Sequence, residues 1–337
     1  MPSLIYEAPQ RVRHVININN ISDIFSISKL TNLKELDLNS NIIEDISALK
    51  SLLNLTHLYL QQNKLTSYTV ALLNLVEFEL SGNPLQDKSG LQHSNKLESL
   101  NLSGSETTDL QTIPHQLLGL KVLYLSSNNL KEISYLSNFV DLQCLELGGN
   151  QLLYNIGPLK FCMQLTELGI VDSNVADIWP LQFMINLKTF QMNKTKVVDL
   201  HPLQNLYQLE YISAHHTCII DISPLSKLTS LNFLNVSFNK ITNAETLKHL
   251  KISKYLLSNY QVPTTDELNF YNKILSVHNS HKQIRTIQNY NKITLFRTSL
   301  TLKKNVVSTI FDYYARKMNR QLELLAYYIQ SSNTQQQ

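Results

Sequence analysis

Leucine and other apolar residues recur along most of the chain in one frame, LxxLxLxxNxL. The frame is clearest in LKELDLNSNII (33–43), LTHLYLQQNKL (55–65), LKVLYLSSNNL (120–130) and LNFLNVSFNKI (231–241). Alternate side chains of a strand point to opposite faces, so each LxL predicts a short strand with its leucines inward. Eleven units fit the frame at intervals of about 22 residues, starting near Arg11, Leu33, Leu55, Leu75, Leu97, Leu120, Leu142, Leu165, Leu187, Leu209 and Leu231.

A polar residue follows each predicted strand at a fixed position. Seven units have asparagine and four have serine or threonine there: Asn19, Asn41, Asn63, Asn83, Asn128, Asn150, Asn239, Ser105, Ser173, Thr195 and Thr217. A buried turn must satisfy its backbone N–H and C=O groups, and a short polar side chain can supply a partner. Later in four successive units, proline recurs at one fixed position, as Pro158, Pro180, Pro202 and Pro224. Proline suits the first turn of a helix, which predicts a short helical or 3₁₀ turn at each.

One short strand cannot bury its apolar face alone, so the units are expected to stack in parallel over a continuous core. A repeat of about 22 residues with a fixed polar turn excludes a coiled coil. The units resemble the leucine-rich repeats of the SDS22-like class, which phosphatase-regulatory proteins and internalins share. The resemblance covers residues 11–252 and implies an α/β solenoid, a right-handed curved stack whose concave parallel sheet docks a protein partner.

The frame also predicts the side chains of that concave face, which are the third, fifth and seventh residues of each unit. Six acidic positions stand against one basic position, Arg13. Such a surface suits a basic protein partner and not a nucleic-acid backbone, and its aromatic residues are candidate anchors. The candidate partner-binding residues are Glu35, Asp37, His57, Tyr59, Glu77, Glu79, Tyr124, Glu146, Glu167, Tyr211 and Phe233.

Catalytic and metal-binding motifs are missing from the sequence. It contains no GxGxxG, GxxxxGK[ST], HExxH or GxSxG, so we expect neither enzyme activity nor a cofactor. His215 and His216 precede Cys218, but strand alternation would point them apart, so no metal site is expected. Cys144 is expected to be a surface thiol on the concave face.

Composition bounds the cellular setting. The chain is 43% hydrophobic and 16% charged, which is typical of a folded protein, and its three cysteines are odd in number and widely spaced. The first residues lack the apolar run of a signal peptide, and no stretch is long enough to span a membrane. A cytoplasmic or nuclear location is expected, with cysteines in the reduced form.

The last part of the sequence differs from the repeats. Residues 1–10 are expected to form a lead-in and residues 11–252 the repeats, whereas residues 253–330 contain apolar positions spaced three or four apart and predict a helical extension. Residues 331–337 are expected to be a disordered tail. From residue 253 onward eleven Lys and Arg stand against four Asp and Glu. The extension could cap the solenoid, dimerise through its apolar stripe, or bind nucleic acid or the cytoskeleton through its basic helices.

Overall fold

The computed structural model describes residues 13–16 and 20–257. They lie in the first of two compact units, Met1–Tyr271; the second is Asn272–Gln337. The expectations for the lead-in, for Asn19, for the helices beyond residue 257 and for the tail lie outside the described residues.

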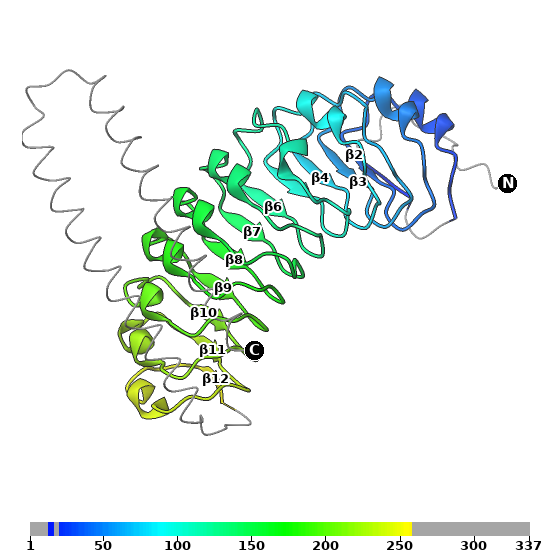
Figure 1. Ribbon diagram of the computed structural model, residues 1–337. Coiled ribbons are helices and arrows are strands. Elements are labelled where there is room, and N and C mark those ends of the chain that lie inside the picture. The colour runs from blue at the N-terminus through cyan, green and yellow to red at the C-terminus, as the bar shows by residue number, and fades with distance from the viewer. Residues whose placement is uncertain (1–12, 17–19, 258–337) are drawn as a thin grey trace, which may run out of the picture. The chain divides into compact units, whose positions relative to one another are not determined.

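Twelve short parallel strands form one sheet, in which each strand pairs with its neighbour in the sequence (Figure 1). Consecutive strands are paired at equivalent positions of the frame, as in Leu36 opposite Leu58 and Leu123 opposite Leu145. The frame therefore predicted both the strands and their register. The strands are β1 (Arg13–Val15), β2 (Glu35–Asp37), β3 (His57–Tyr59), β4 (Glu77–Glu79), β5 (Ser99–Asn101), β6 (Val122–Tyr124), β7 (Cys144–Glu146), β8 (Glu167–Gly169), β9 (Thr189–Gln191), β10 (Tyr211–Ser213), β11 (Phe233–Asn235) and β12 (Lys254–Leu256).

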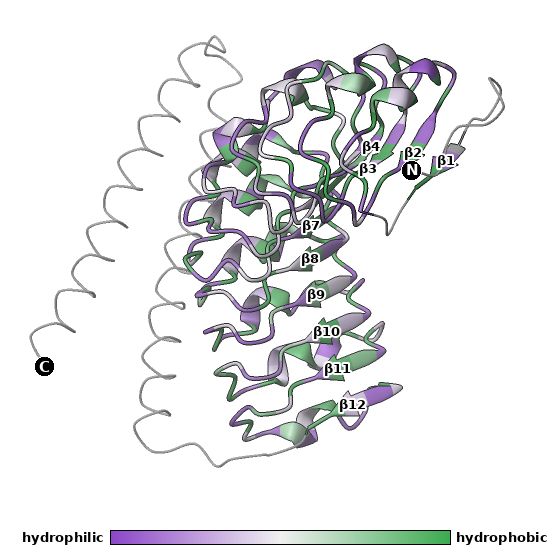
Figure 2. Cartoon of the chain, turned by 90° about the vertical axis from the view of Figure 1, so that its right-hand side faces the viewer, coloured by the Kyte–Doolittle hydropathy of each residue, from purple (hydrophilic) through white to green (hydrophobic). Residues whose placement is uncertain are grey.

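The core is a continuous column of apolar residues at the central positions of β2 to β11. Leu36, Leu58, Phe78, Leu100 and Leu123 are each fully buried on successive strands. A strand of this length has too few hydrogen bonds and too little apolar area to persist alone, so burial against both neighbours stabilises it. Figure 2 shows that the strands carry hydrophilic as well as hydrophobic residues, as expected for a sheet with one covered face.

The polar turn position ties neighbouring units together. The side-chain amide of Asn150 donates to the carbonyl of Leu147 in its own unit at 2.7 Å and to that of Leu125 in the preceding unit at 3.0 Å. Its oxygen accepts from the N–H of Leu130 at 3.0 Å. Equivalent bonds join Asn41, Asn63, Asn83, Asn128 and Asn239 to their own and the preceding unit. The predicted role of this position is confirmed for the described asparagines.

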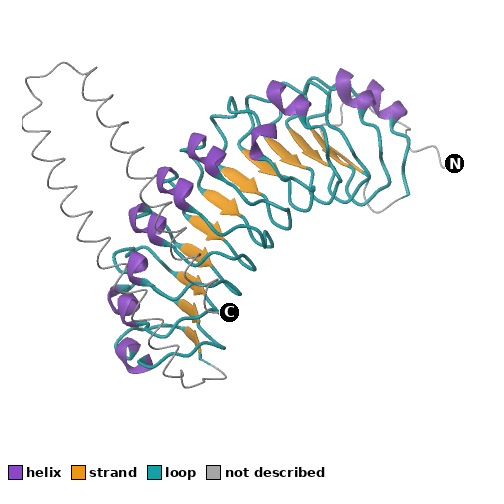
Figure 3. Cartoon of the chain, in the orientation of Figure 1, coloured by secondary structure: helices purple, strands orange, loops and turns teal. Residues whose placement is uncertain are grey.

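Short 3₁₀ turns form the opposite side of the stack (Figure 3). Pro158, Pro180, Pro202 and Pro224 each lie in the first turn of one of them, as predicted. An aspartate often precedes the turn and accepts a backbone N–H two residues on, as Asp177 does from Trp179 at 2.8 Å. The turns are η1 (Phe25–Lys29), η2 (Ser47–Ser51), η3 (Ser89–His93), η4 (Leu110–Thr112), η5 (Ser134–Asn138), η6 (Gly157–Phe161), η7 (Trp179–Phe183), η8 (His201–Leu203), η9 (Ser223–Lys227) and η10 (Ala244–Leu247).

The described stack is curved, with the 3₁₀ turns on its outer side and the strands toward its inner side (Figure 1). Parallel strands pack about 4.8 Å apart. Units that are thicker on the turn side than on the strand side must therefore fan out around the strands. The outward positions of the strands thus lie on the concave face.

The sheet continues past residue 252, where the repeats were expected to end, into β12. Tyr255 pairs with Leu234, and the frame continues through Ile252, Tyr255 and Leu257. This unit was not predicted because it has a tyrosine in place of the central leucine and lacks the polar turn residue. Its start at Ile252, close to one repeat length after Leu231, was a usable signal.

Candidate concave binding face

Two columns of outward side chains run along the sheet, one from the first residue of each strand and one from the third. The strand register brings all eleven candidate residues onto this face, and none of them falls in the core. The first column contains Glu35, His57, Glu77, Glu167, Tyr211 and Phe233, and the second contains Asp37, Tyr59, Glu79, Tyr124 and Glu146. Lys254 is the lysine of these columns, at the β12 end of the sheet.

Acidic residues concentrate on β2 to β4. Glu77 Oε2 lies 3.9 Å from Nε2 of His57, which makes an ion pair when that histidine is protonated. Burial raises the pKa of the Glu79 carboxyl, and the nearby Glu77 charge adds to the rise, whereas a hydrogen bond from Asn101 opposes it. A cationic side chain arriving here would favour the ionised form of Glu79.

Cys144 is not the surface thiol that the sequence suggested. Only 8% of it is exposed, and its Sγ lies 3.8 Å from Oη of Tyr124 and 3.8 Å from Oε2 of Glu167. Burial raises the pKa of this thiol to about 11, with the carboxylates of Glu167 and Glu146 adding to the rise. The larger side chains of Tyr124 on β6 and Glu167 on β8 cover the small side chain of Cys144. An outward strand position is therefore not always an exposed one.

Gly169 provides the space for Glu146, a relation that the sequence analysis missed. A Cβ at Gly169 would overlap the carboxylate of Glu146, whose side chain therefore lies across the next strand. Burial raises the pKa of Glu146, and the charge of Glu167 raises it further. A glycine directly beside a glutamate in the frame was the available signal. Three polar residues, Tyr124, Glu146 and Glu167, thus surround Cys144 in the middle of the face.

Aromatic residues form the other end of the face. The rings of Tyr211 and Phe233 stack with centroids 4.2 Å apart and planes 4° apart, and Lys254 Nζ lies 5.5 Å from the Phe233 ring. Offset stacking and cation–π contact are favourable arrangements for such groups. The concave face is therefore acidic over β2 to β4, mixed at β6 to β8 and aromatic at β10 and β11.

His215 and His216 do contact each other, contrary to the expectation that alternation would separate them. They lie in the turn after β10, where strand alternation no longer applies, and His216 has a left-handed φ of 55°. Their Nδ1 atoms are 2.9 Å apart. Burial lowers the pKa of His215, and His216 and Lys194 lower it further, which favours the neutral ring. Over residues 13–16 and 20–257, no group of three or more His, Cys, Asp and Glu side chains is arranged to hold a metal ion.

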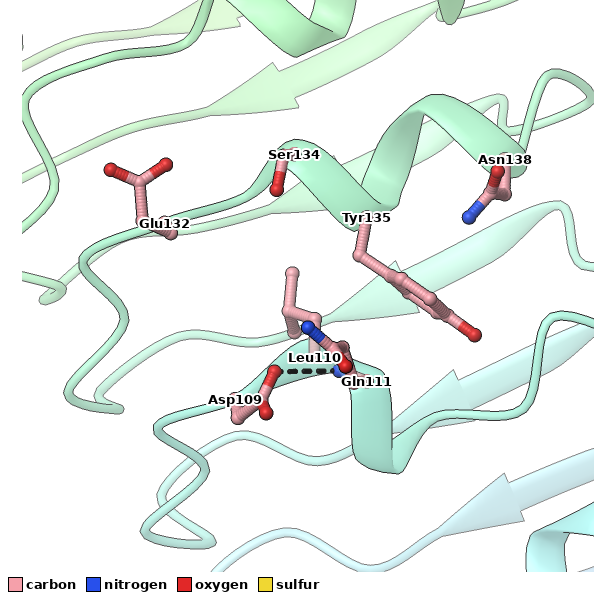
Figure 4. A pocket seen from close by; sticks show the side chains of 7 residues that line it. All are labelled: Asp109, Leu110, Gln111, Glu132, Ser134, Tyr135 and Asn138. Atoms are coloured by element: carbon pink, nitrogen blue, oxygen red, sulfur yellow. Dashed lines mark hydrogen bonds between the residues drawn. The ribbon is translucent and has the colours of Figure 1, made fainter.

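A depression of about 250 Å³ lies on the outer side, between η4 and η5 (Figure 4). Its lining includes Asp109, Glu132 and Tyr135, none of which is a concave-face residue. The carboxylate of Asp109 accepts the backbone N–H of Gln111 at 2.8 Å and so serves as the cap of η4. This depression contains none of the candidate residues and is separate from the candidate face.

The repeat frame, the single parallel sheet and the asparagine bonds between units define a leucine-rich-repeat solenoid. The family model of Leucine Rich repeats (2 copies) matches residues 14–51 and 207–249. The described part of the chain thus has the leucine-rich-repeat fold, and its units have the length typical of such repeats. Among curated proteins, none matches the chain.

Solved structures with the same fold include bacterial and plant proteins. The internalin InlF of Listeria monocytogenes is 29% identical with a TM-score of 0.69, over 76% of this chain and 83% of that one. A leucine-rich-repeat protein of Leptospira interrogans is 24% identical with a TM-score of 0.58, over 75% and 74%. The plant peptide hormone receptor RGFR1, solved in complex with RGF2, is 17% identical with a TM-score of 0.57, over 74% and 48%. In the part of this chain that the structure describes, no helix has the length and apolar character needed to cross a membrane.

Proposed function

We propose that this protein is a non-enzymatic interaction scaffold that binds a basic segment of a partner protein on its concave face. The observation that carries the proposal is the two aligned columns of side chains, in which six carboxylates share one face with four aromatic rings. Carboxylates on a concave surface attract and orient cationic side chains, while aromatic rings supply the apolar contact that slows dissociation.

The fold supports a binding role for this face. Leucine-rich-repeat domains bind protein partners, and the plant receptor of the same fold was solved in complex with RGF2. A finer role, regulation of a protein phosphatase, rests on the resemblance of the repeats to the SDS22-like class. A cytoplasmic or nuclear location stays a prediction from the sequence.

The test uses peptides selected from a random library on the immobilised full-length protein, followed by titration of the chosen peptides. We expect them to be rich in Lys and Arg. Glu77→Lys with Glu79→Lys should raise their Kd at least about tenfold, which corresponds to roughly 1.4 kcal/mol. The matched control is Glu44→Lys with Glu132→Lys, which makes the same charge change at exposed positions outside the strands.

Each result of the titration decides between functions. Loss of binding in the concave-face variant alone supports the proposal. Equal loss in both variants means that net charge, not the concave face, governs binding and contradicts it. If both variants bind unchanged, the peptides bind elsewhere and the concave-face proposal is contradicted. The same titration with a protein phosphatase catalytic subunit tests the finer role.

A further inference from the structure

A second surface, which the concave face does not use, runs along the edge of the stack. It is defined by the position two residues before the first leucine of a unit. Large apolar side chains recur at this position in many of the units. Seven of these side chains are 50–66% exposed: Leu53, Leu73, Leu118, Val140, Met163, Ile185 and Tyr207. We call these seven residues the edge column. Single exposed leucines are ordinary, but a repeated column of large apolar side chains forms a surface, which Asn95 interrupts between Leu73 and Leu118.

Hydrogen bonds between units keep the edge column aligned. The side-chain amide of Asn74 donates to the carbonyl of Leu53 at 2.8 Å, and that of Asn186 donates to the carbonyl of Met163 at 3.4 Å. In each case the donor asparagine directly follows one residue of the column, and the carbonyl belongs to the column residue of the preceding unit. Ile185 is therefore held beside Met163, one unit along the stack.

The edge column widens over four consecutive units because η6 and η7 end in phenylalanine. Phe161 and Phe183 are 48% and 45% exposed and lie two residues before Met163 and Ile185. We call Val140, Phe161, Met163, Phe183, Ile185 and Tyr207 the apolar ridge. The core beneath it is already filled, since Cys162, Met184 and Leu206 are fully buried. The ridge side chains are thus not needed to complete the core.

The area of the ridge approaches that of a specific interface. Each half-exposed side chain of this size presents roughly 100 Å², so the six together present on the order of 600 Å². A typical monomer exposes no apolar patch larger than about 300–600 Å². Stable complexes bury about 800 Å² per partner, so the six side chains would make up most of one partner's share of such an interface.

The charge around the ridge selects the class of partner. In the segments that form it, residues 138–141, 160–164, 182–186 and 204–208, the charged side chains are Asp141 and Lys160. Lys160 Nζ lies 4.9 Å from the Phe161 ring. Nucleic acid and anionic lipid surfaces both need several cations, which this surface lacks. A partner with a neutral apolar surface of its own fits best.

We propose that the apolar ridge binds the same ridge of a second copy of this chain, giving a two-fold dimer. Equal spacing between units makes the ridge match itself after a two-fold rotation. An axis between the Met163 and Ile185 units places Met163 against Ile185 of the second copy and Val140 against Tyr207 of the second copy. Such a self-complementary contact is the commonest kind in soluble oligomers. It uses none of the concave-face residues.

The first experiment measures the mass of the full-length protein by sedimentation over about 1–100 µM, a range set by the affinity of ordinary dimers. The wild type should sediment as a dimer of a 38.7 kDa chain. Ile185→Glu should weaken the dimer at least about tenfold, because it buries a charge in the contact. The matched control is Leu53→Glu, in the same column at similar exposure but outside the ridge, and it should stay dimeric. Circular dichroism confirms that both variants are folded.

A second experiment tests the pairing. Met163→Lys and Ile185→Glu should each be monomeric alone. Their mixture should form a one-to-one dimer, because the introduced lysine of one copy then meets the introduced glutamate of the other. A monomeric wild type, an unchanged mass for Ile185→Glu, or equal dissociation by Leu53→Glu overturns the ridge dimer. Failure of the mixture to associate overturns the two-fold pairing. None of these outcomes depends on concave-face binding.

Discussion

Individual side chains on the concave face differ in environment although they occupy equivalent frame positions. Glu146 lies over Gly169 and beside Glu167, whereas Glu79, at the same position of β4, is hydrogen-bonded by Asn101. Desolvation disfavours an ionised carboxyl, and a neighbouring carboxylate disfavours it further. The raised pKa of Glu146 therefore means that its charge destabilises the folded protein at neutral pH.

Glu146→Gln should stabilise the free protein at pH 7. A raised folded-state pKa contributes stability that is fully present below the unfolded pKa and is lost as pH rises through the folded value. Removing the ionisable group should therefore raise the urea midpoint at pH 7, with a smaller gain near pH 4. Glu44→Gln, at an exposed position outside the strands, should change little at either pH. A Glu146→Gln protein less stable than wild type at pH 7 would show that the carboxylate is stabilised by its surroundings.

At the scale of the elements, the turn after each strand decides how firmly neighbouring units are joined. Asparagine reaches both its own unit and the preceding one. Ser173 and Thr195 donate only to their own unit, to the carbonyls of Ile170 and Met192, both at 2.7 Å. The length of the side chain and its second hydrogen-bonding group account for the difference.

Asn150→Ala should destabilise the protein by about 2–4 kcal/mol, because it leaves a buried N–H and two buried carbonyls without their partner. Asn150→Ser should cost less, since serine can still donate within the unit, as Ser173 does. Gln151→Ala, at the exposed neighbouring position, is the control and should stay within about 0.5 kcal/mol of wild type. Urea unfolding measures all three. Equal costs for alanine and serine would contradict the view that the own-unit bond matters.

At the scale of the whole stack, each unit is stabilised by its two neighbours, and no distant part of the sheet compensates for a lost unit. Leu123 on β6 is fully buried between Leu100 and Leu145. A fault at this central strand should therefore divide the solenoid in two, unlike a fault in a globular core.

Leu123→Asp should cost several kcal/mol, because it buries a carboxylate with no partner in an apolar column. Hydrogen exchange should show the greatest loss of protection in β5 to β7, with less change toward β2 and β11. Val122→Thr, one residue away at an outward position, should leave protection nearly unchanged. Uniform loss of protection along all strands would mean that the stack unfolds as a single cooperative unit.

The sequence by itself determined the solenoid. Its frame defined the strands, their register, the bridging role of the asparagines, the proline positions of the 3₁₀ turns and the membership of the concave columns. These properties are local and repeat, so each unit carries the same information and errors in one unit do not spread. Even β12 fits the frame if a tyrosine is accepted at its central position.

The tertiary structure decided the properties that depend on side chains in different units. The repeat frame predicts only whether a side chain points inward or outward. It does not predict that Cys144 is covered, that the Glu146 carboxylate lies above Gly169 or that His215 contacts His216. The apolar ridge likewise joins residues of successive units that the repeat frame treats as ordinary turn positions. Burial and pKa depend on the size and charge of neighbours across the stack, and a periodic pattern of apolar and polar residues does not contain that information.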